Sequence, residues 1–517
     1  MLKQKKNTRK HDIITARVQS KNRQKVCRLG EEMYRKQVYG QIKLDIPFGV
    51  PLDINNRWVK LAGIMPWEKI EERYGSNFGG ERGQVAKSGR LAFGALYIQG
   101  RLGITDEETV SQIQENPSMQ YFCGYECYTP EKPFDSSLMV HFRKRITAEM
   151  MKEITEEAFA AEALRAIEKE KDDNDDGGSG EARNDDSTNE SEPKGTMLLD
   201  ATCCPSDIHY PTDVHLLNHA RELTEEIIDV LHEQAPQGEE KPRTYRKVAR
   251  KVYLAYAKKR RNTSMEIRFV IRRQLQYIRR NLDTIGKQID SGASLVHLNN
   301  ELYRKLLVVS ELYRQQKLMY DEKIHKVDDR IVSIAQPHVR PIVRGKASAS
   351  VEFGAKVATA RIGGFVFIIH MEFDNFSEAV YLEKAAEEYK RIFGFYPKTI
   401  IGDKAYGTNS NRNYCKSKGI RLSALKRGRQ TEEARKAEKK QLYDDGCKRN
   451  AIEGDYGITK RKFGLDLVMT KLFNTTMTAI SFGFFIKNME RVLRFFVLLY
   501  TYIIGIIWKL FPRHSPC

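Results

Sequence analysis

Three side chains near the carboxyl-terminal end combine one acid with two cations at helical spacing. Arg449, Glu453 and Lys460 stand four and then seven positions apart, so on a helix all three project from one face. This set suits metal-dependent phosphodiester chemistry, because the acid can hold a divalent metal while the cations hold the phosphate beside it. The same spacing also describes an exposed basic helix that contains one Glu, and Gly454 and Gly457 weaken the helix prediction.

Two further acids close short apolar runs upstream. Asp200 ends the run that begins at Thr196, and Asp403 ends the run that begins at Thr399. A buried strand that ends in Asp presents its carboxylate at the carboxyl edge of a sheet, where open α/β sheets bind their ligands. Each Asp taken alone is more often a helix N-cap or a turn residue. Together with Glu453 they form an Asp, Asp, Glu set that predicts a metal site.

Several longer stretches surround these acids in a fixed order. They are DATCCPSDIHYPTD from Asp200, HVRPIVRGKASASVEFGAKV from His338, IIGDKAYGT from Ile400 and RNAIEGDYGITKRKFGL from Arg449. Earlier, between 57 and 146, stand LYIQGRLGITDEETVSQIQENPSMQYFCGY and PFDSSLMVHFRKRI. In this order the motifs resemble those of bacterial insertion-sequence transposases of the DDE class with an InsH-type amino-terminal domain. Related enzymes often carry Tyr three residues before the Arg of the last motif. This chain has Gly446 there, so no stacking or phosphate contact is carried over to that position.

The resemblance implies an α/β fold, with an RNase H-like catalytic core that contains a helical insertion and with an all-α amino-terminal domain. The order of the expected elements agrees with it, since the pattern predicts a helical series from Pro211 to about Val327 after the first strand. The pattern predicts later strands at 331–335, 348–357, 364–373 and 398–402, and helices at 377–393 and 409–418.

Composition divides the chain into regions. We expect a basic flexible arm (1–45), a helical DNA-binding domain of InsH type (46–167), an acidic disordered linker (168–195), an RNase H-like DDE catalytic domain (196–490, with the insertion at about 211–327) and an apolar tail (491–517). The linker lacks the apolar residues that would offset the entropy cost of folding. The arm suits contact with DNA phosphate, and a solubilising tail is the alternative.

The tail and the helical DNA-binding domain carry more local signals. The uncharged run FFVLLYTYIIGIIW spans about fourteen positions, short of the roughly twenty that cross a bilayer, which favours a core or subunit contact over a membrane segment. In the helical domain, the pattern predicts a helix over 84–101 and a capping box of Thr105 with Glu108 that opens a helix over 106–115. The basic Arg143, Lys144 and Arg145 near its end suit the binding of DNA ends.

The charge balance predicts a polyanionic partner. The net charge is +19 and the pI is about 9.3, and the basic residues recur in blocks, which favours nucleic acid over a membrane surface. Acids are almost absent between 241 and 280, so we assign Arg246, Lys247 and Arg250 to phosphate contact, with a solvated charged face as the alternative. Eight cysteines without an apolar leader predict a reduced, cytoplasmic protein. The resemblance implies a prokaryotic, nucleoid-associated one.

Other chemistries fit the sequence less well. Cys203, Cys204, His209, His215 and His219 lie close together, but they lack the paired spacing of a zinc motif. No phosphate-binding GxxxxGK[ST] loop occurs, so ATP use is not implied.

The resemblance implies a specific activity. The chain would be a transposase that binds the terminal inverted repeats of its insertion sequence, cuts DNA and joins the freed 3′ ends to target DNA. Asp200, Asp403 and Glu453 would hold Mg²⁺, for which Mn²⁺ can substitute. Arg449, Lys460, Lys404 and Tyr406 would contact the phosphate or the terminal base.

The resemblance also implies the partners. They are double-stranded DNA and a second copy of the chain, as a homodimer or larger assembly, with no ATP and no obligate membrane. Two alternatives stay open at this point. One is a non-catalytic sequence-specific DNA-binding protein derived from a transposase, and the other is a structure-specific nuclease without strand transfer.

Overall fold

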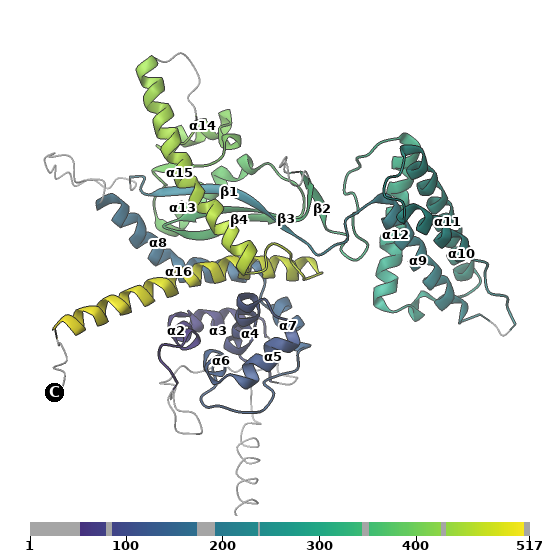
Figure 1. Ribbon diagram of the computed structural model, residues 1–517, viewed down its shortest axis with the longest axis horizontal. Helices are drawn as coiled ribbons and strands as arrows, with labels where there is room; N and C mark the ends of the chain where they lie inside the picture. Colours follow the sequence, from purple (N-terminus) through teal and green to yellow (C-terminus); the bar gives the residue numbers. More distant parts are fainter. Residues whose placement is uncertain are drawn as a thin grey trace, which may run out of the picture. The chain divides into compact units, whose positions relative to one another are not determined.

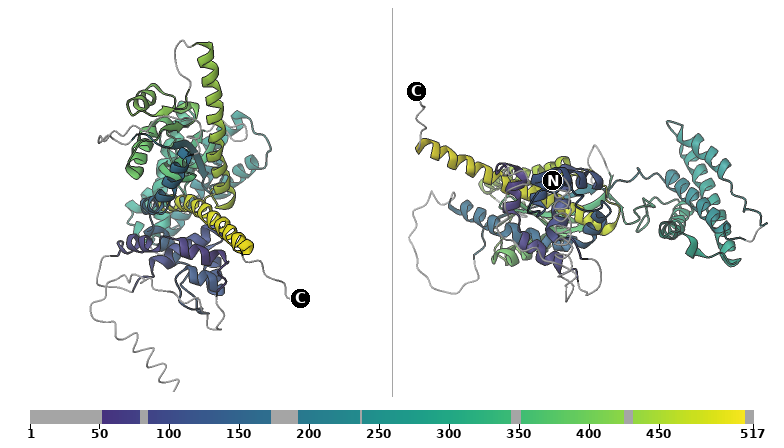
Figure 2. Two further views of the ribbon diagram at one scale, coloured as in Figure 1. Left: turned by 90° about the vertical axis from the view of Figure 1, so that its left-hand side faces the viewer. Right: turned by 90° about the horizontal axis from the view of Figure 1, so that it is seen from below.

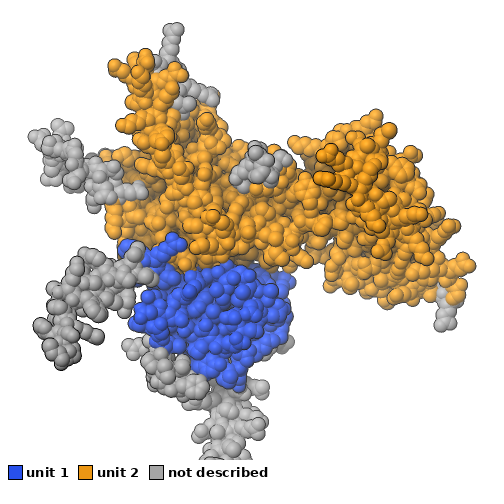
Figure 3. Space-filling model, in the orientation of Figure 1, with its two compact units in different colours: residues 1–154, 492–517 blue, residues 155–491 orange. Residues whose placement is uncertain are grey.

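The computed structural model describes residues 52–78, 85–172, 192–235, 238–343, 351–424 and 431–510 (Figure 1). The chain divides into two compact units, residues 1–154 with 492–517 and residues 155–491 (Figure 3). The predicted basic arm at 1–45 lies outside the described residues, as does the acidic linker from 173 to 191. The boundaries drawn from composition therefore stay predictions.

The described part of the first unit up to residue 154 is helical. Its helices are α2 (Arg57–Ile64), α3 (Trp67–Gly75), α4 (Gly89–Leu102), α5 (Asp106–Glu115), α6 (Pro117–Phe122), α7 (Leu138–Arg145) and the start of α8 (Ala148–Asp172). Phe122 lies in the aromatic core of this unit. Its ring centroid is 5.1 Å from that of Trp67 and 5.4 Å from that of Trp58. Burial of these rings against one another supplies much of the apolar area that holds such a small unit together.

Local capping signals set two helix boundaries in this unit. The predicted helix 106–115 is confirmed as α5, and the Thr105 hydroxyl accepts the amide of Glu108 at 3.2 Å. The end predicted at 101 is confirmed within one residue, since α4 ends at Leu102 and Gly103 takes the left-handed conformation, with φ of 67°, that glycine tolerates. Its start is Gly89, later than predicted, because Ser88 provides the N-cap.

The second unit contains a mixed sheet. Its strands are β1 (Thr196–Pro205), β2 (Arg340–Val343), β3 (Val351–Ile362), β4 (Phe365–Glu372), β5 (Thr399–Ile401) and β6 (Arg421–Leu422). The order is β2-β3-β1-β5-β6, and β4 also pairs with β3. The central strand β1 runs antiparallel to β3 and parallel to β5, which in turn runs parallel to β6. The expectation of a mixed α/β protein is confirmed.

Most of the predicted elements around this sheet are confirmed. The strand expected at 364–373 is β4, and the one at 398–402 is β5. The helix expected at 377–393 begins as a 3₁₀ turn, η2 (Glu378–Tyr381), and continues as α13 (Leu382–Phe393). The helix expected at 409–418 is α14 (Asn409–Ser417).

Two expectations about strands were wrong. Residues 331–335 form no strand. Instead, Ile331 and Ile334 pack into the core of the helical insertion, and the Ile331 amide donates to the Gln315 side chain at 3.0 Å. A short apolar run signals burial without specifying a strand. Also, β1 does not end at Asp200 but continues to Pro205, because the residues after Asp200 pair with β3.

The predicted helical series is confirmed as an insertion between β1 and β2. It comprises α9 (Asp213–His232), α10 (Arg246–Ala257), α11 (Ser264–Asp290), η1 (Leu295–His297) and α12 (Asn300–Glu322). Figures 1 and 2 show α9, α11 and α12 packed side by side. Leu217, Ile278 and Val309 are fully buried between them, so the apolar stripe predicted from the sequence forms the core of this bundle.

Two long helices complete the described chain, α15 (Glu432–Lys462) and α16 (Phe473–Leu510). The Asn488 side chain on α16 bonds both the amide and the carbonyl of Val366 on β4, which fixes α16 along this strand. Phe159 on α8 stacks on Phe365 at 5.3 Å and contacts Phe485 at 5.4 Å. Within the described residues, no helix is both long enough and apolar enough to span a bilayer.

Candidate active site

The central strand carries the first acid of the predicted set. Asp200 is half-buried on β1 opposite Thr359 of β3, and its carboxylate accepts the Ala201 amide at 2.8 Å. Burial raises the pKa of Asp200 to about 6, against the lowering effects of the Ala201 amide and of Arg449.

The second acid follows the neighbouring strand. In the parallel pair of β1 and β5, Leu198 lies opposite Ile401, so Asp200 and Asp403 both stand two residues further along adjacent strands. Asp403 caps the 3₁₀ turn η3 (Lys404–Tyr406), and its carboxylate accepts the Lys404 amide at 2.6 Å. Its side chain is 54% exposed. Asp403 is therefore positioned by β5 and open to solvent.

The third acid lies on α15, which crosses the sheet over β1 (Figure 1). Two contacts fix this helix on either side of Glu453. Before it, Asp445 accepts two hydrogen bonds from Arg421 of β6, at 2.8 and 2.9 Å. After it, the Tyr456 hydroxyl bonds Thr359 at 2.7 Å, next to Asp200 across the β1 and β3 pair. The position of Glu453 is thus set by the sheet and not by α15 alone.

A buried ion network also anchors α15. Asp455, two residues after Glu453, accepts from Arg361 of β3 at 2.9 Å and from Lys487 of α16 at 2.8 Å. Burial lowers the pKa of Lys487 to about 8, although the Asp455 carboxylate opposes the change. The buried ion pair of Asp455 and Lys487 fixes the position of α15 on α16 more than it stabilises the fold, because desolvation of the two charges offsets most of their attraction.

One guanidinium connects the acids. The Arg449 side chain lies 2.8 Å from a Glu453 oxygen and 3.7 Å from an Asp403 oxygen. Its charge also lowers the pKa of Asp200, against the larger effect of burial. The predicted shared face of Arg449 and Glu453 is confirmed by their contact. Lys460 lies on the same helix, half-exposed.

The donor chemistry of this set suits a divalent metal, while its arrangement is that of ion pairs. Carboxylate oxygens are the ligands that Mg²⁺ and Mn²⁺ prefer. Within the described residues, no three His, Cys, Asp or Glu side chains are close enough together to enclose a metal ion. Arg449 instead lies between Asp403 and Glu453 and balances their charge. The carboxylates are therefore of the chemical type that binds a divalent metal, but the Arg449 guanidinium lies between Asp403 and Glu453.

Sequence reasoning missed a fourth acid near this set. Glu378 begins η2 and pairs with Lys356 of β3 at 3.1 Å. Its charge adds to the rise of the Asp200 pKa that burial causes. No spacing rule could have found Glu378, because it reaches the site through the pairing of β3 with β4 and the turn that follows.

Tyr406 differs from the other predicted DNA contacts around the acids. Lys404 is exposed, whereas Tyr406 is 2% exposed and packs beneath Gly402. A side chain at residue 402 would collide with its ring, so glycine is required there. Burial raises the pKa of Tyr406, and the charges of Glu378 and Asp200 add to this. Tyr406 therefore forms the floor beneath the acids.

The remaining predicted DNA contacts fall into two groups. Lys144, Lys247 and Arg250 are exposed. In contrast, Arg143 pairs with Asp106, Arg246 pairs with Asp229, and the Arg145 guanidinium lies 4.8 Å from the Phe78 ring centroid. The paired arginines hold helices together, which sequence alone does not reveal.

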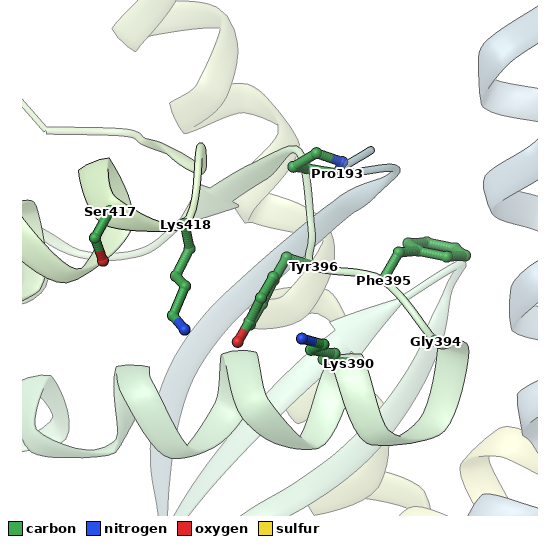
Figure 4. Close-up of a pocket in the computed structure, with 7 residues that line it drawn as sticks. All are labelled: Pro193, Lys390, Gly394, Phe395, Tyr396, Ser417 and Lys418. Atoms are coloured by element: carbon green, nitrogen blue, oxygen red, sulfur yellow. The ribbon is translucent and has the colours of Figure 1, made fainter. Parts of the chain in front are cut away.

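A separate hollow of about 320 Å³ lies at the other end of the sheet (Figure 4). The Tyr396 ring lies in it between Lys390 and Lys418, whose amines are 4.7 and 5.1 Å from the ring centroid. Lys194, which precedes β1, donates its amide to the Tyr396 carbonyl at 2.9 Å. This hollow lies at the start of β1, away from the acids.

Comparisons with known proteins identify two transposase domains in the chain. Residues 400–490 match the family described as transposase DDE domain, and residues 51–145 match the family described as transposase domain (DUF772). The first match contains Asp403, Arg449, Glu453 and Lys460. These matches put the chain in the transposase class of enzymes.

A relative extends the comparison. The uncharacterized protein ORF8 in the nfe locus of Rhizobium meliloti is 32% identical over 165 residues, which are 32% of this chain and 69% of that protein. No solved structure matches the chain. The chain belongs to the DDE transposases of insertion sequences, with a DUF772 domain on its amino-terminal side. The resemblance drawn from the sequence motifs is thereby confirmed.

Proposed function

We propose that this transposase binds the terminal inverted repeats of its insertion sequence and catalyses metal-dependent DNA cleavage and strand transfer at Asp200, Asp403 and Glu453. The observation that carries the proposal is the position of Arg449, which contacts Asp403 and Glu453 and whose charge lowers the pKa of Asp200. The three acids come from β1, from the turn after β5 and from α15, which are far apart in the sequence. A half-buried Asp with a raised pKa beside an ion pair is a feature that often accompanies functional sites.

The strand arrangement supports an RNase H-like core. Along the path β4-β3-β1-β5-β6, the first two strands alternate in direction with β1, and the last two run parallel to it. The acids then lie on the central strand, directly after its parallel neighbour and on a late helix. This is the arrangement expected for that core, with the insertion of α9 to α12 placed after β1.

The proposed chemistry assigns separate tasks to the side chains. Asp200, Asp403 and Glu453 would hold Mg²⁺, or Mn²⁺ in its place, since hard cations take oxygen ligands. When bound, the metal activates the attacking water or 3′-hydroxyl and stabilises the leaving oxygen. Arg449 would then turn its guanidinium from the carboxylates to the scissile phosphate, which offers the same bidentate oxygen geometry.

Exposed cations would supply DNA affinity away from the acids. Lys144 on α7 and Lys247 and Arg250 on α10 face solvent, so each can neutralise a phosphate. Lys460 and Lys404 would do the same close to the acids. Pairing of two element ends would require a homodimer or a larger assembly, with double-stranded DNA as partner.

Cleavage at the element boundary tests the proposal. Purified full-length chain is incubated with labelled DNA that carries the ends flanking its gene, target DNA and Mg²⁺. Asp403→Asn and Glu453→Gln are expected to lower cleavage by about a thousandfold or more, because each removes part of a charge stabilisation worth several kcal/mol. DNA binding, measured by gel shift, should remain. Asp444→Asn, which changes an exposed acid on the same helix, is the matched control and should cleave normally.

Three results would contradict the proposal. Binding without cleavage by the wild type would indicate a DNA-binding protein derived from a transposase. Cleavage without covalent joining to target DNA would indicate a nuclease. Equal activity of Asp444→Asn and Glu453→Gln would remove Glu453 from the site.

A further inference from the structure

Two large apolar side chains project into solvent from the first turns of α11 in the helical insertion. Met265 is 84% exposed and Phe269 is 58% exposed. They stand four positions apart, so they lie on one face of the helix. The opposite face packs into the bundle, where Gln274, Ile278 and Asn281 are buried. Met265 and Phe269 therefore have no part in the core of the insertion, and their burial against a partner would be favourable.

Arginines share this outer face with the two apolar residues. Arg268 and Arg272 follow Met265 by three and seven positions, and both are exposed. The Arg268 guanidinium carbon lies 4.1 Å from the ring centroid of Tyr320 on α12, and the guanidinium donates to the Tyr320 carbonyl at 3.1 Å. The outer face of α11 thus alternates apolar and cationic side chains, and one of its cations is fixed by a neighbouring helix.

The turn between α10 and α11 holds this face in place. Thr263 and Glu266 form a capping box, in which the Thr263 hydroxyl accepts the Glu266 amide at 3.3 Å and the Glu266 carboxylate accepts the Thr263 amide at 2.8 Å. Glu266 also pairs with Lys259, which follows α10. Arg260 and Arg261 stand exposed in the same turn. The first turns of α11 are therefore a rigid, solvent-facing element.

The charge around Met265 and Phe269 indicates the kind of partner. Residues 258–273 include seven Lys or Arg and one acid, Glu266, so a second copy of this surface would bring like charges together. A lipid surface suits it poorly, because Arg268 and Arg272 interrupt the apolar face. A DNA duplex offers phosphates to the cations and base edges to the apolar side chains between them.

We propose that the first turns of α11 enter the major groove of DNA, where Met265 and Phe269 contact the methyl groups of thymines. An α-helix with its side chains is about 10–12 Å across, which fits a major groove of about 12 Å and not a minor groove of about 6 Å. The arginines beside them contact the flanking phosphates. The insertion then reads base sequence as well as holding phosphate. This inference rests on the proposed function, since its ligand is the DNA of the element ends.

Removal of the thymine methyl groups tests the contact directly. Binding of the full-length chain to a labelled duplex of the element ends is measured by fluorescence anisotropy, with EDTA present so that no cleavage is involved. The same duplex with uracil in place of thymine lacks only the methyl groups. The wild type should bind this second duplex more weakly, by about fourfold for each contacted methyl.

Variants assign the lost affinity to α11. The double variant Met265→Ala/Phe269→Ala should distinguish the thymine and uracil duplexes less than the wild type does, because the apolar partners of the methyl groups are gone. Val296→Ala is the matched control, since it shortens an 88% exposed apolar side chain in η1, and it should distinguish the duplexes like the wild type. Circular dichroism verifies the fold of each variant.

Arg272→Gln separates the phosphate contact from the base contact. It should weaken binding to both duplexes equally and reduce the slope of log K against log salt by about 0.9, the value for one lost phosphate contact on duplex DNA. The double variant Met265→Ala/Phe269→Ala should leave this slope unchanged, because it removes no charge.

Several results would overturn the inference. One is a wild type that binds both duplexes alike, and another is a double variant that distinguishes them as well as the wild type does. A double variant that only lowers self-association in sedimentation would indicate a contact between copies instead. A wild type that binds neither duplex contradicts the proposed function as well, whereas a wild type that distinguishes the duplexes but does not cleave with Mg²⁺ contradicts the proposed cleavage alone.

Discussion

Replacement of Asp200 by Asn is expected to stabilise the metal-free protein although it removes an acid of the proposed active site. Burial raises the pKa of Asp200 from its ordinary 3.8 to about 6. At about 1.4 kcal/mol for each pKa unit, the ionised carboxylate costs the fold on the order of 3 kcal/mol. Asn has nearly the same shape and no charge, so the variant avoids this cost.

The raised pKa of Asp200 determines how the stability gained in Asp200→Asn depends on pH. Below about pH 4 the carboxyl is protonated in both the folded and the unfolded chain, and Asp200 costs nothing. Between about pH 4 and pH 6 the unfolded chain releases this proton first, so the stability of the wild type falls as pH rises. Above about pH 6 the full cost is present. The advantage of Asp200→Asn should therefore be small at pH 4 and complete at pH 8.

Hydrogen exchange of the β1 and β3 amides measures this advantage, because core strands open only with large unfolding events. With EDTA present, exchange in Asp200→Asn should be slower than in the wild type by about a hundredfold at pH 8, which corresponds to about 3 kcal/mol. Asp403→Asn is the control, since this exposed side chain keeps its capping role as Asn. A destabilised Asp200→Asn at pH 8, or an advantage independent of pH, would refute the reasoning.

Three further predictions concern the elements that position the acids. Arg421→Met should destabilise the second unit by about 3 kcal/mol in chemical denaturation, because it leaves the buried Asp445 without its bidentate partner; an effect below about 1 kcal/mol would contradict this. Thr359→Val should cost about 1–3 kcal/mol by removing the bond to the buried Tyr456 hydroxyl, and adding Tyr456→Phe should recover most of the loss. Thr105→Ala should cost about 1 kcal/mol in thermal unfolding of the first unit, through loss of the α5 N-cap, with no change in the melting of the second.

Local signals in the sequence predicted many elements correctly. Thr105 defines the start of α5 and Gly103 the end of α4, because a cap acts on amides within one helical turn. The run 364–373 gave β4 for a similar reason, since a strand of β-branched and aromatic residues needs few other signals. The prediction of a strand at 331–335 was wrong because the conformation of this run depends on Gln315 and on the core of the helical insertion.

The ion-pair partners of charged residues could not be predicted from the sequence. Arg143 and Arg246 read as DNA contacts in the sequence, yet Asp106 and Asp229 hold them in ion pairs. Those acids lie in other helices, and no spacing rule relates them to the arginines. Glu378 was missed for the same reason, as only the folded sheet brings it near Asp200.

The sequence by itself determined the transposase family, and it supplied the three acids and their companion Arg449 as the candidate site. These features are local: motifs, the four-residue spacing of Arg449 and Glu453, and short apolar runs before Asp200 and Asp403. The tertiary structure decided which cations face solvent, that Tyr406 is buried, and that Arg449 connects two of the acids. Burial and ion pairing depend on contacts between segments far apart in the chain, and only the folded sheet with α15 across it specifies them.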